Sequence, residues 1–301
     1  MDSWISRDLL DRLNAEGTTI HRLYSGVDDW VERYGDDLLL CVRHRDDADR
    51  LRDWQGEWAA ETGFQARRLF VKHLRQGPGS ETAELLTGDP SLPLAVTATE
   101  LGLRYKIDFG AGYSTGLFPD QRENRRFLLN LKPKTVLNTF SYTCGFSVAA
   151  ASVGAQTTSV DVAKKALEWG RENFTLNTLP TEGHKFWPDD VRDVLRRQAQ
   201  RESQFDVVIL DPPTFARNQK GKVFRAEDEL PELAIQAFPL LARGGHLLLS
   251  TNCESLSQAD LEGWAAEAAR ACGRRVTPVA VPPPEEFPPG QGATTLWVKA
   301  D

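Results

Sequence analysis

The sequence predicts an α/β protein with a small α+β domain at residues 1–92 and a larger domain at residues 93–301 built on a mostly parallel sheet. Three observations support this fold class. The chain has 301 residues, which at about 150 residues per domain suggests two domains. Gly, Pro and Ser gather at 76–93, as is typical of a connection between domains. From about residue 135 onward, strand and helix patterns alternate.

The N-terminal domain is expected to mix helices with short strands. Residues 6–15 and 46–62 have helical patterns, and residues 38–42 and 69–71 have the apolar pattern of strands. We recognise no catalytic group of residues in this part of the sequence. A role in recognising the substrate is therefore the expectation for this domain.

The C-terminal domain is expected to alternate strands and helices along its whole length. Strands separated by helices imply right-handed crossovers and a parallel sheet with both faces covered. Ligands of such sheets bind outside the carboxyl ends of the strands, so the residues after each strand are the candidates for chemistry. A turn is expected at Gly244 and Gly245. The predicted strands are 136–138, 157–160, 185–187, 205–210, 246–250 and 296–299, and the predicted helices are 146–153, 163–177, 190–202, 228–242 and 257–271.

The charge distribution bears on whether nucleic acid is a partner. The formal net charge of −7 argues against nucleic acid if it is taken for the chain as a whole. Counted along the sequence, however, residues 1–100 carry −7 and residues 101–301 sum to zero, while residues 101–140 carry +4. The acidic excess therefore belongs to the N-terminal third, and the overall charge does not exclude RNA.

Cysteine spacing and hydropathy indicate a cytoplasmic protein. The four Cys residues form no CxxC pair, which argues against a zinc site or a disulfide scaffold and suits a reducing compartment. No apolar run approaches the roughly 20 residues that span a bilayer, and the first eight residues do not resemble a signal peptide. We expect no bound metal and no membrane partner. The oligomeric state is left open, a homodimer included.

The turn after the first predicted strand indicates a nucleoside-like ligand. It runs from Asn138 to Ser147 and feeds a helix, but Gly145 is its only glycine, so it lacks the GxGxxG pattern of a pyrophosphate cradle. A nucleoside without phosphates, such as S-adenosylmethionine, fits this turn better. Two alternatives are an ordinary strand–helix loop and, from topology, a nicotinamide oxidoreductase, against which the scarcity of glycine argues.

Carboxylates follow the next two predicted strands. Asp161 lies 23 residues after Asn138, where an acidic residue can accept both ribose hydroxyls. Asp190 follows the third strand and could reach an adenine amino group, a role for which Asp189 competes. The alternative for Asp161 and Asp190 is a helix N-cap, and capping and ligand binding are compatible.

The fourth predicted strand ends in Asp211-Pro212-Pro213-Thr214-Phe215, the most specific local signal in the sequence. Two prolines stop the strand in a rigid turn that lacks backbone donors. Such a turn can receive a flipped base, on which Phe215 can stack. A purely structural turn is the alternative. The next segment carries four positive charges suited to a phosphate backbone, or simply to a solvated loop: Arg217, Lys220, Lys222 and Arg225.

Cys253 follows the fifth predicted strand, near the expected position of Asp211. A thiolate nucleophile is what methylation at cytosine C5 requires. Its attack at C6 makes C5 nucleophilic enough to take a methyl group, and a base then removes the C5 proton. The alternative is an inert cysteine, the ordinary case.

Several of these stretches together resemble the S-adenosylmethionine-dependent large-subunit (23S) rRNA methyltransferase family, which includes cytosine-C5 enzymes and guanine-N7 relatives. They occur in family order over roughly residues 100–255. The matching residues are Thr115-Gly116-Leu117-Phe118, Asp120-Gln121-Arg122, Asn124-Arg125, the turn from Asn138 to Ser147, Ser159-Val160-Asp161, Ala166-Leu167-Glu168-Trp169, Asn173, Asn177, Asp190, Leu210 to Ala216, and Ser250 to Cys253.

The resemblance implies a class I (Rossmann-like) methyltransferase fold with a mostly parallel seven-stranded sheet. It implies catalytic roles for Cys253, at the position of the cytosine-C5 nucleophile, and Asp211, and contacts to the substrate RNA by Pro212, Phe215 and the basic segment. The RNA is expected to be 23S rRNA or a ribosomal precursor. The residues implied for the S-adenosylmethionine site are Gln121, Arg122, Asn138, Phe140, Thr143, Gly145, Phe146, Asp161, Val162, Asp190, Val191 and Asp211.

The sequence departs from the family at a few places. Cytosine-C5 members usually begin with an RNA-binding PUA domain, for which there is no room before residue 20. Ser114 replaces a common lysine, and the tail at 282–287 differs from the usual ending. The leading hypothesis is methylation of an rRNA base at cytosine C5. Guanine-N7 methylation, a small-molecule or protein methyltransferase, and a cofactor-binding RNA assembly factor without turnover stay as alternatives.

Overall fold

The computed structural model describes residues 3–43, 45–74, 82–112, 114–217 and 223–301. Its contacts divide the chain into two compact units. The N-terminal unit comprises Met1–Arg122 and Pro284–Pro289, and the C-terminal unit comprises Glu123–Pro283 and Gly290–Asp301. None of the helices described is long and apolar enough to cross a membrane.

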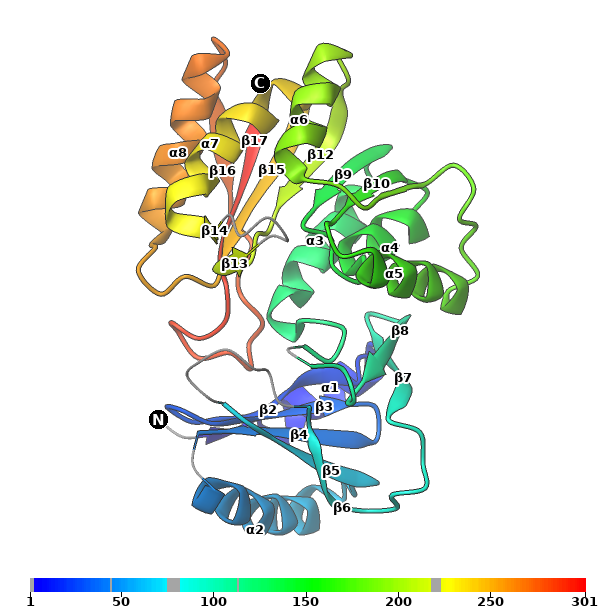
Figure 1. Ribbon diagram of the computed structural model, residues 1–301. Helices are drawn as coiled ribbons and strands as arrows, with labels where there is room; N and C mark the ends of the chain where they lie inside the picture. Colours follow the sequence, from blue (N-terminus) through cyan, green and yellow to red (C-terminus); the bar gives the residue numbers. More distant parts are fainter. Residues whose placement is uncertain (1–2, 44, 75–81, 113, 218–222) are drawn as a thin grey trace. The chain divides into compact units, whose positions relative to one another are not determined.

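The N-terminal unit is built on a six-stranded sheet with the strand order β1-β2-β3-β4-β5-β6, and only the β4–β5 pair is parallel (Figure 1). Helix α1 begins after Ser6, whose side chain accepts a hydrogen bond from the Leu9 backbone N–H, and it buries three leucines in the core of the unit. The elements are β1 (Ser3–Trp4), α1 (Arg7–Ala15), β2 (Ile20–Ser25), β3 (Trp30–Tyr34), β4 (Asp37–Val42), α2 (Arg45–Thr62), β5 (Arg68–His73), β6 (Glu84–Thr87), β7 (Ala95–Glu100), β8 (Leu103–Asp108) and the 3₁₀ turn η1 (Pro119–Gln121).

The division between the units differs from the sequence-based division at residues 92 and 93. The β7–β8 hairpin belongs to the N-terminal unit because it is hydrogen-bonded to the chain just before β2. The Thr19 backbone N–H donates to the Thr99 carbonyl at 2.7 Å, and the Leu101 backbone N–H donates to Thr18 Oγ1 at 2.9 Å. These bonds join segments about eighty residues apart, which local sequence patterns do not reveal.

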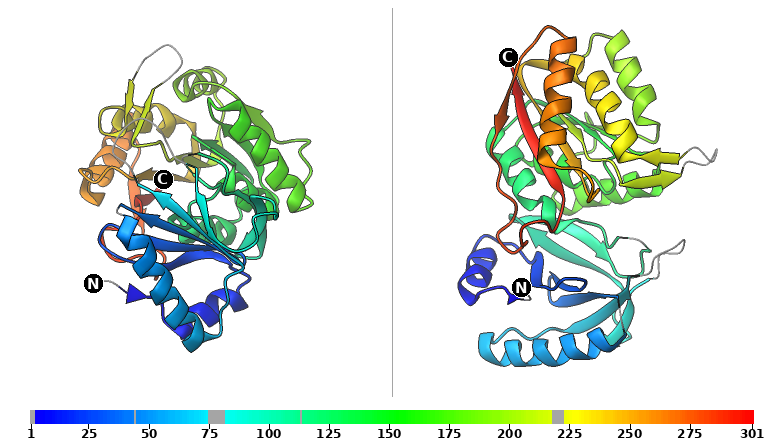
Figure 2. Two further views of the ribbon diagram at one scale, coloured as in Figure 1. Left: turned by 60° about the horizontal axis from the view of Figure 1, so that its bottom comes forward. Right: turned by 90° about the vertical axis from the view of Figure 1, so that its left-hand side faces the viewer.

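The C-terminal unit contains the predicted seven-stranded sheet, in the order β11-β10-β9-β12-β15-β17-β16. Figures 1 and 2 show this unit from three directions. Strands β11, β10, β9, β12 and β15 are mutually parallel, while β17 pairs antiparallel with both β15 and β16. The strands are β9 (Thr135–Thr139), β10 (Gln156–Val160), β11 (Lys185–Trp187), β12 (Phe205–Leu210), β15 (Leu241–Thr251), β16 (Val276–Val279) and β17 (Thr294–Ala300), with the separate hairpin β13 (Phe215–Arg217) and β14 (Val223–Arg225). This arrangement confirms the predicted fold class.

Both faces of this sheet are covered, as the alternation along β12 shows. Val208 and Leu210 pack into one core with side chains of α6, α7 and α8, whereas Val207 and Ile209 pack into another with side chains of α3 and α4. Successive strand residues point to opposite faces, so a strand that is apolar throughout is buried on both sides. The helices are α3 (Arg122–Leu131), α4 (Gly145–Ser152), α5 (Lys164–Leu176), α6 (Val191–Gln200), α7 (Ala226–Ala237), the 3₁₀ turn η2 (Phe238–Leu240) and α8 (Gln258–Ala271).

One predicted helix and one predicted turn differ from the structure. Helix α7 ends at Ala237, and β15 already begins at Leu241, so the expected helix over 228–242 was too long. The expected turn at Gly244 and Gly245 lies within the bounds of β15 as an irregularity, where pairing with β12 shifts register. Gly244 has φ +75°, a backbone conformation that glycine adopts without strain.

Candidate active site

Five parallel strands end at one edge of the C-terminal sheet, and the predicted residues of this unit follow them. Val160 of β10 pairs with Thr139 of β9, Thr139 pairs with Leu210 of β12, and Leu210 pairs with Leu249 of β15. The loops after these strands therefore begin at the same level. They bring together the turn after Asn138, Asp161, Asp190, Asp211 and the segment that leads to Cys253.

The loop after β9 adopts an unusual backbone. Three of its non-glycine residues have left-handed φ angles, with Phe140 at +50°, Tyr142 at +45° and Cys144 at +64°. Each such residue costs about 1–3 kcal/mol and persists only where the surroundings fix it. Here, Ser141 N–H donates to the Val160 carbonyl at 3.0 Å, and Asn173 Nδ2 donates to the Thr143 carbonyl at 2.9 Å. The tight turn that the sequence indicated is thus formed by non-glycine residues in left-handed conformations.

Asp161 directly follows β10 at this edge. One carboxylate oxygen accepts the Tyr142 backbone N–H at 2.9 Å, and the other accepts the Ala163 backbone N–H at 2.8 Å. Burial raises the pKa of Asp161, while the two backbone hydrogen bonds partly oppose the rise. The next side chain, Val162, is apolar and 66% exposed. A carboxylate held by the backbone beside exposed apolar surface suits a nucleoside with ribose hydroxyls.

Asp189 and Asp190, which competed for one role, have different partners. Asp190 caps α6 by accepting the Arg192 backbone N–H at 2.9 Å. Asp189 accepts from the Arg197 guanidinium, which holds the pKa of Asp189 below its ordinary value. Asp190 therefore fills the helix-capping position that was its alternative, and a ligand contact by its remaining carboxylate oxygen stays a prediction.

Several residues predicted at the cofactor site are buried. Asn138 is 1% exposed and donates to Ser147 Oγ at 2.9 Å. Phe146 and Val191 pack into the two hydrophobic cores. The other buried ones are Thr143 and Gly145, whereas Phe140 is half-buried against a core. Sequence patterns placed these residues at the strand ends and helix starts of this sheet edge but did not reveal which side chains turn inward.

Asp211 and Cys253 follow neighbouring strands. Asp211 directly follows β12 and is half-buried, and the next residue, Pro212, is buried in the turn. Cys253 lies two residues beyond the end of β15, is partly exposed, and donates its backbone N–H to Thr251 Oγ1 at 3.1 Å. The carboxylate and the thiol thus sit on adjacent strand ends, as the sequence predicted.

Sequence patterns did not identify two residues near Cys253. Ser255 Oγ lies 3.2 Å from Cys253 Sγ and donates to Glu227 Oε2 at 3.4 Å. Glu227 lies in the first turn of α7, which is far from Cys253 in the sequence. The spacing of Cys253 and Ser255 could have suggested the serine, but only the fold brings Glu227 to it.

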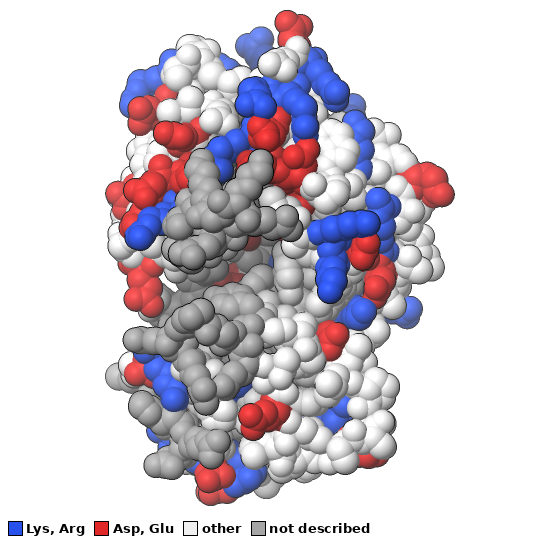
Figure 3. All heavy atoms as spheres, viewed as in Figure 1, with Lys and Arg blue, Asp and Glu red and all other residues white. Residues whose placement is uncertain are grey.

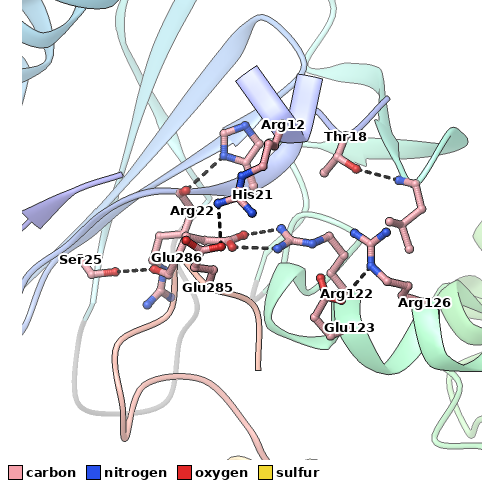
Figure 4. A network of polar contacts seen from close by, with 11 residues as sticks. Arg12, Thr18, His21, Arg22, Ser25, Arg122, Glu123, Arg126, Glu285 and Glu286 are labelled. Carbon is pink, nitrogen blue, oxygen red and sulfur yellow. Dashed lines mark hydrogen bonds and ion pairs between the residues drawn. The ribbon is translucent and has the colours of Figure 1, made fainter. Parts of the chain in front are cut away.

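Gln121 and Arg122 belong to the N-terminal unit and are both 2% exposed. The Arg122 guanidinium makes a two-pronged, buried ion pair with Glu286, in which Nη2 lies 2.8 Å from Oε2 (Figure 4). Their roles at the cofactor site stay predictions. Glu286 is a partner of Arg122 that sequence spacing could not identify, because the two residues are 164 positions apart.

The predicted RNA-contacting segment is described only in part. Phe215 and Arg217 lie on β13, and Arg225 ends β14, which pairs with it. Arg225 is exposed and lies 3.9 Å from Glu227 in an ion pair. Lys220 and Lys222 lie outside the described residues. In Figure 3, coloured Lys and Arg side chains are interspersed with Asp and Glu, so the described residues on that face do not form a uniformly basic field.

The chain is similar to known proteins over most of its length. A family model for S-adenosylmethionine-dependent methyltransferases matches residues 18–298. The YwbD protein of Bacillus subtilis is 33% identical over 272 residues, which are 87% of this chain and 68% of YwbD. The ribosomal RNA large subunit methyltransferase I of Escherichia coli is 37% identical over 210 residues, which are 67% of this chain and 52% of that protein. The chain therefore spans about half the length of this second relative.

Solved structures agree with the fold. The crystal structure of SMU.776 complexed with SAH has a TM-score of 0.83 and 26% identity, and the match covers 97% of this chain and 79% of the other. An S-adenosylmethionine-dependent methyltransferase from Agrobacterium tumefaciens has a TM-score of 0.73 and 25% identity, with 93% and 90% coverage. These matches extend over both units.

Proposed function

The chain belongs to the S-adenosylmethionine-dependent methyltransferase family, and from this premise we propose that it methylates C5 of a cytosine in large-subunit rRNA with Cys253 as the nucleophile. One observation carries the proposal. A partly exposed thiol and a half-buried carboxylate, those of Cys253 and Asp211, follow adjacent parallel strands at the ligand-binding edge of the sheet. The name of the Escherichia coli relative supports rRNA as the substrate.

The residues at the ends of β9, β10 and β11 fit the cofactor. Asp161 has the fixed carboxylate that ribose hydroxyls require, and exposed Val162 offers apolar surface to an adenine ring. Asp190 stands one strand further along and would reach the adenine amino group. When bound, S-adenosylmethionine supplies an electrophilic methyl group.

The residues after β12 and β15 would then have complementary roles in the methylation of the cytosine. The Cys253 thiolate bonds to C6 of the cytosine, which gives C5 the electron density to accept the methyl group. A base removes the C5 proton, the electron pair restores the C5–C6 double bond, and the C6–sulfur bond breaks to release the thiolate. Asp211 would bind the base or take this proton, and Ser255 Oγ lies 3.2 Å from Cys253 Sγ.

Methylation of rRNA from a strain that lacks this protein tests the proposal. Nucleosides would be analysed by mass spectrometry after reaction with wild type, Cys253→Ala, Cys253→Ser and the control Cys272→Ala. Cys272 is also partly exposed, but it follows α8 and not a strand end. We expect 5-methylcytidine from wild type and control, and a loss of more than about 10³-fold in both Cys253 variants.

The other outcomes separate the alternatives. Unimpaired methylation by both Cys253 variants would rule out the covalent mechanism and favour a nitrogen atom, such as guanine N7. Turnover only with small molecules or proteins would exclude RNA as the substrate. A recognition role for the N-terminal unit belongs to the same proposal, and it predicts weaker RNA binding when exposed residues of that unit are changed.

A further inference from the structure

Three buried side chains near the loop that follows β9 form a chain of hydrogen bonds. Asn138 Nδ2 donates to Ser147 Oγ at 2.9 Å, and Ser147 Oγ lies 2.8 Å from Ser159 Oγ. The three side chains are buried, with Asn138 1% exposed and both serines fully buried. They come from β9, α4 and β10, so the chain of bonds ties these elements together.

The chain of bonds has a defined direction. Because the Asn138 amide nitrogen can only donate, Ser147 Oγ accepts from it and gives its own proton to Ser159. Ser159 Oγ accepts this proton, so the buried amide and both hydroxyls each have a hydrogen-bond partner. A buried network in which every member is satisfied is rigid and specifies a single arrangement.

The first bond of this chain spans the strained loop, because Asn138 precedes the loop and Ser147 follows it. Cys144 has φ +64°, and two residues before it Tyr142 has φ +45° and donates its backbone N–H to Asp161. Left-handed residues other than glycine keep their conformation only where other contacts enforce it. Asp161 has the position expected for the residue that binds the ribose of the cofactor.

We propose that Asn138, Ser147 and Ser159 are positioning residues for S-adenosylmethionine, which hold the loop Phe140–Cys144 in its left-handed shape and thereby orient Asp161. The proposal rests on the cofactor site described above but not on the RNA substrate. It also gives Asn138 a role different from direct contact, because its amide group is turned toward Ser147 inside the protein.

Binding of S-adenosylhomocysteine to the full chain tests the proposal by isothermal titration calorimetry. Ser147→Ala breaks the middle of the chain of bonds, and we expect its Kd to rise about tenfold, or about 1.4 kcal/mol. In methylation assays, the KM for S-adenosylmethionine should rise by a similar factor while kcat stays within about twofold. Ser152→Ala is the matched control, since this hydroxyl lies on the same helix but donates to the Ala149 carbonyl.

Further variants keep the test decisive. Ser159→Ala should raise the Kd as Ser147→Ala does, and it replaces that variant if Ser147→Ala does not fold. In the double variant, the increase should be smaller than the product of the two single increases, because both changes interrupt one chain of bonds. A Kd within twofold of wild type in folded single variants, even with a lower Tm, would overturn the proposal.

The Kd for S-adenosylhomocysteine can be measured without knowing which molecule the protein methylates. Wild type that binds S-adenosylhomocysteine but methylates no rRNA would refute the proposed function, while the Kd values of the variants would still decide the positioning role. Conversely, normal rRNA methylation with an unchanged Kd in both serine variants would refute the positioning role alone.

Discussion

Cys253 and Cys272 are the partly exposed cysteines of the chain, whereas Cys41 and Cys144 are buried. Burial raises the pKa of Cys144 to about 12 and raises that of Cys41 as well, so these two thiols stay neutral at physiological pH. Of the two partly exposed thiols, Cys253 follows a strand of the sheet and has Ser255 Oγ 3.2 Å from its Sγ, whereas Cys272 follows helix α8. The proposed nucleophile is therefore distinguished from the other three cysteines by its position in the fold.

Asp161 should make binding of S-adenosylhomocysteine sensitive to acid. Its pKa is raised by burial above the ordinary 3.8, so the carboxylate that we propose binds the ribose hydroxyls is protonated at a higher pH than in an exposed aspartate. Affinity should therefore fall as the pH falls through this raised pKa. The pH dependence of folding stability has the opposite sign. The folded state favours protonated Asp161, so the contribution of this group to stability increases as the pH falls.

Calorimetric Kd values over a pH series test this prediction. Asp161→Asn keeps an acceptor but cannot titrate in this range, so it should bind more weakly at neutral pH and show a flatter pH dependence than wild type. The same acid dependence in the variant and in wild type would show that another group is responsible.

At the scale of elements, the loop after β9 depends on close packing against α5. A Cβ atom added to Gly170 would lie 2.4 Å from Cys144 Sγ and 2.9 Å from Cys144 Cβ. The absence of a side chain at Gly170 therefore lets α5 approach the left-handed Cys144. The loop owes part of its shape to a glycine that lies outside it.

Gly170→Ala should lower the free energy of unfolding by about 1–3 kcal/mol, because the added methyl group collides with Cys144. Cys144→Gly in the same chain removes both colliding atoms and suits φ +64°, so the double variant should recover part of the loss. Urea denaturation measures the differences, and Gly263→Ala is the control because an added Cβ there has open space. Additive losses would contradict this packing account.

How well the sequence predicted each helix or strand depends on how distinct the local hydrophobic pattern of that element is. Strands β11 and β12 have their predicted bounds because apolar residues are set off by polar or turn residues at both ends. The β7–β8 hairpin was missed although alternation of polar and apolar residues is a strand signal, because it has few large apolar side chains and follows the Gly- and Pro-rich segment 76–93. At the site, strand order alone brought Asp161, Asp211 and Cys253 to one edge. The inward turn of Asn138 and the approach of Glu227 depend on tertiary contacts that no local pattern encodes.

At the scale of the whole molecule, the chain passes from one unit to the other three times. Residues Pro284–Pro289 come from the segment between β16 and β17 of the C-terminal unit, yet they pack in the N-terminal unit. There Arg12 pairs with Glu285, and the Arg22 guanidinium lies 4.1 Å from the Phe287 ring centre. The buried pair of Arg122 and Glu286 completes these contacts.

Glu286→Ala should destabilise the protein by about 3–5 kcal/mol, because it leaves the buried Arg122 guanidinium without its carboxylate. Glu285→Ala is the neighbouring control and should cost less than about 1 kcal/mol, since its pair with Arg12 is mostly exposed. Thermal and urea unfolding of both variants test the difference. Similar losses would mean that burial of the Arg122 pair has little energetic importance.

The position of Pro284–Pro289 also orders events during synthesis on the ribosome. Residues 1–122 leave the ribosome long before residue 284 is added, so during that interval Arg122 has no Glu286 to pair with. The N-terminal unit therefore completes its native contacts only after residues 123–283, most of the C-terminal unit, have been made. Its last contacts wait for synthesis of the other unit, although most of its own residues are made earlier.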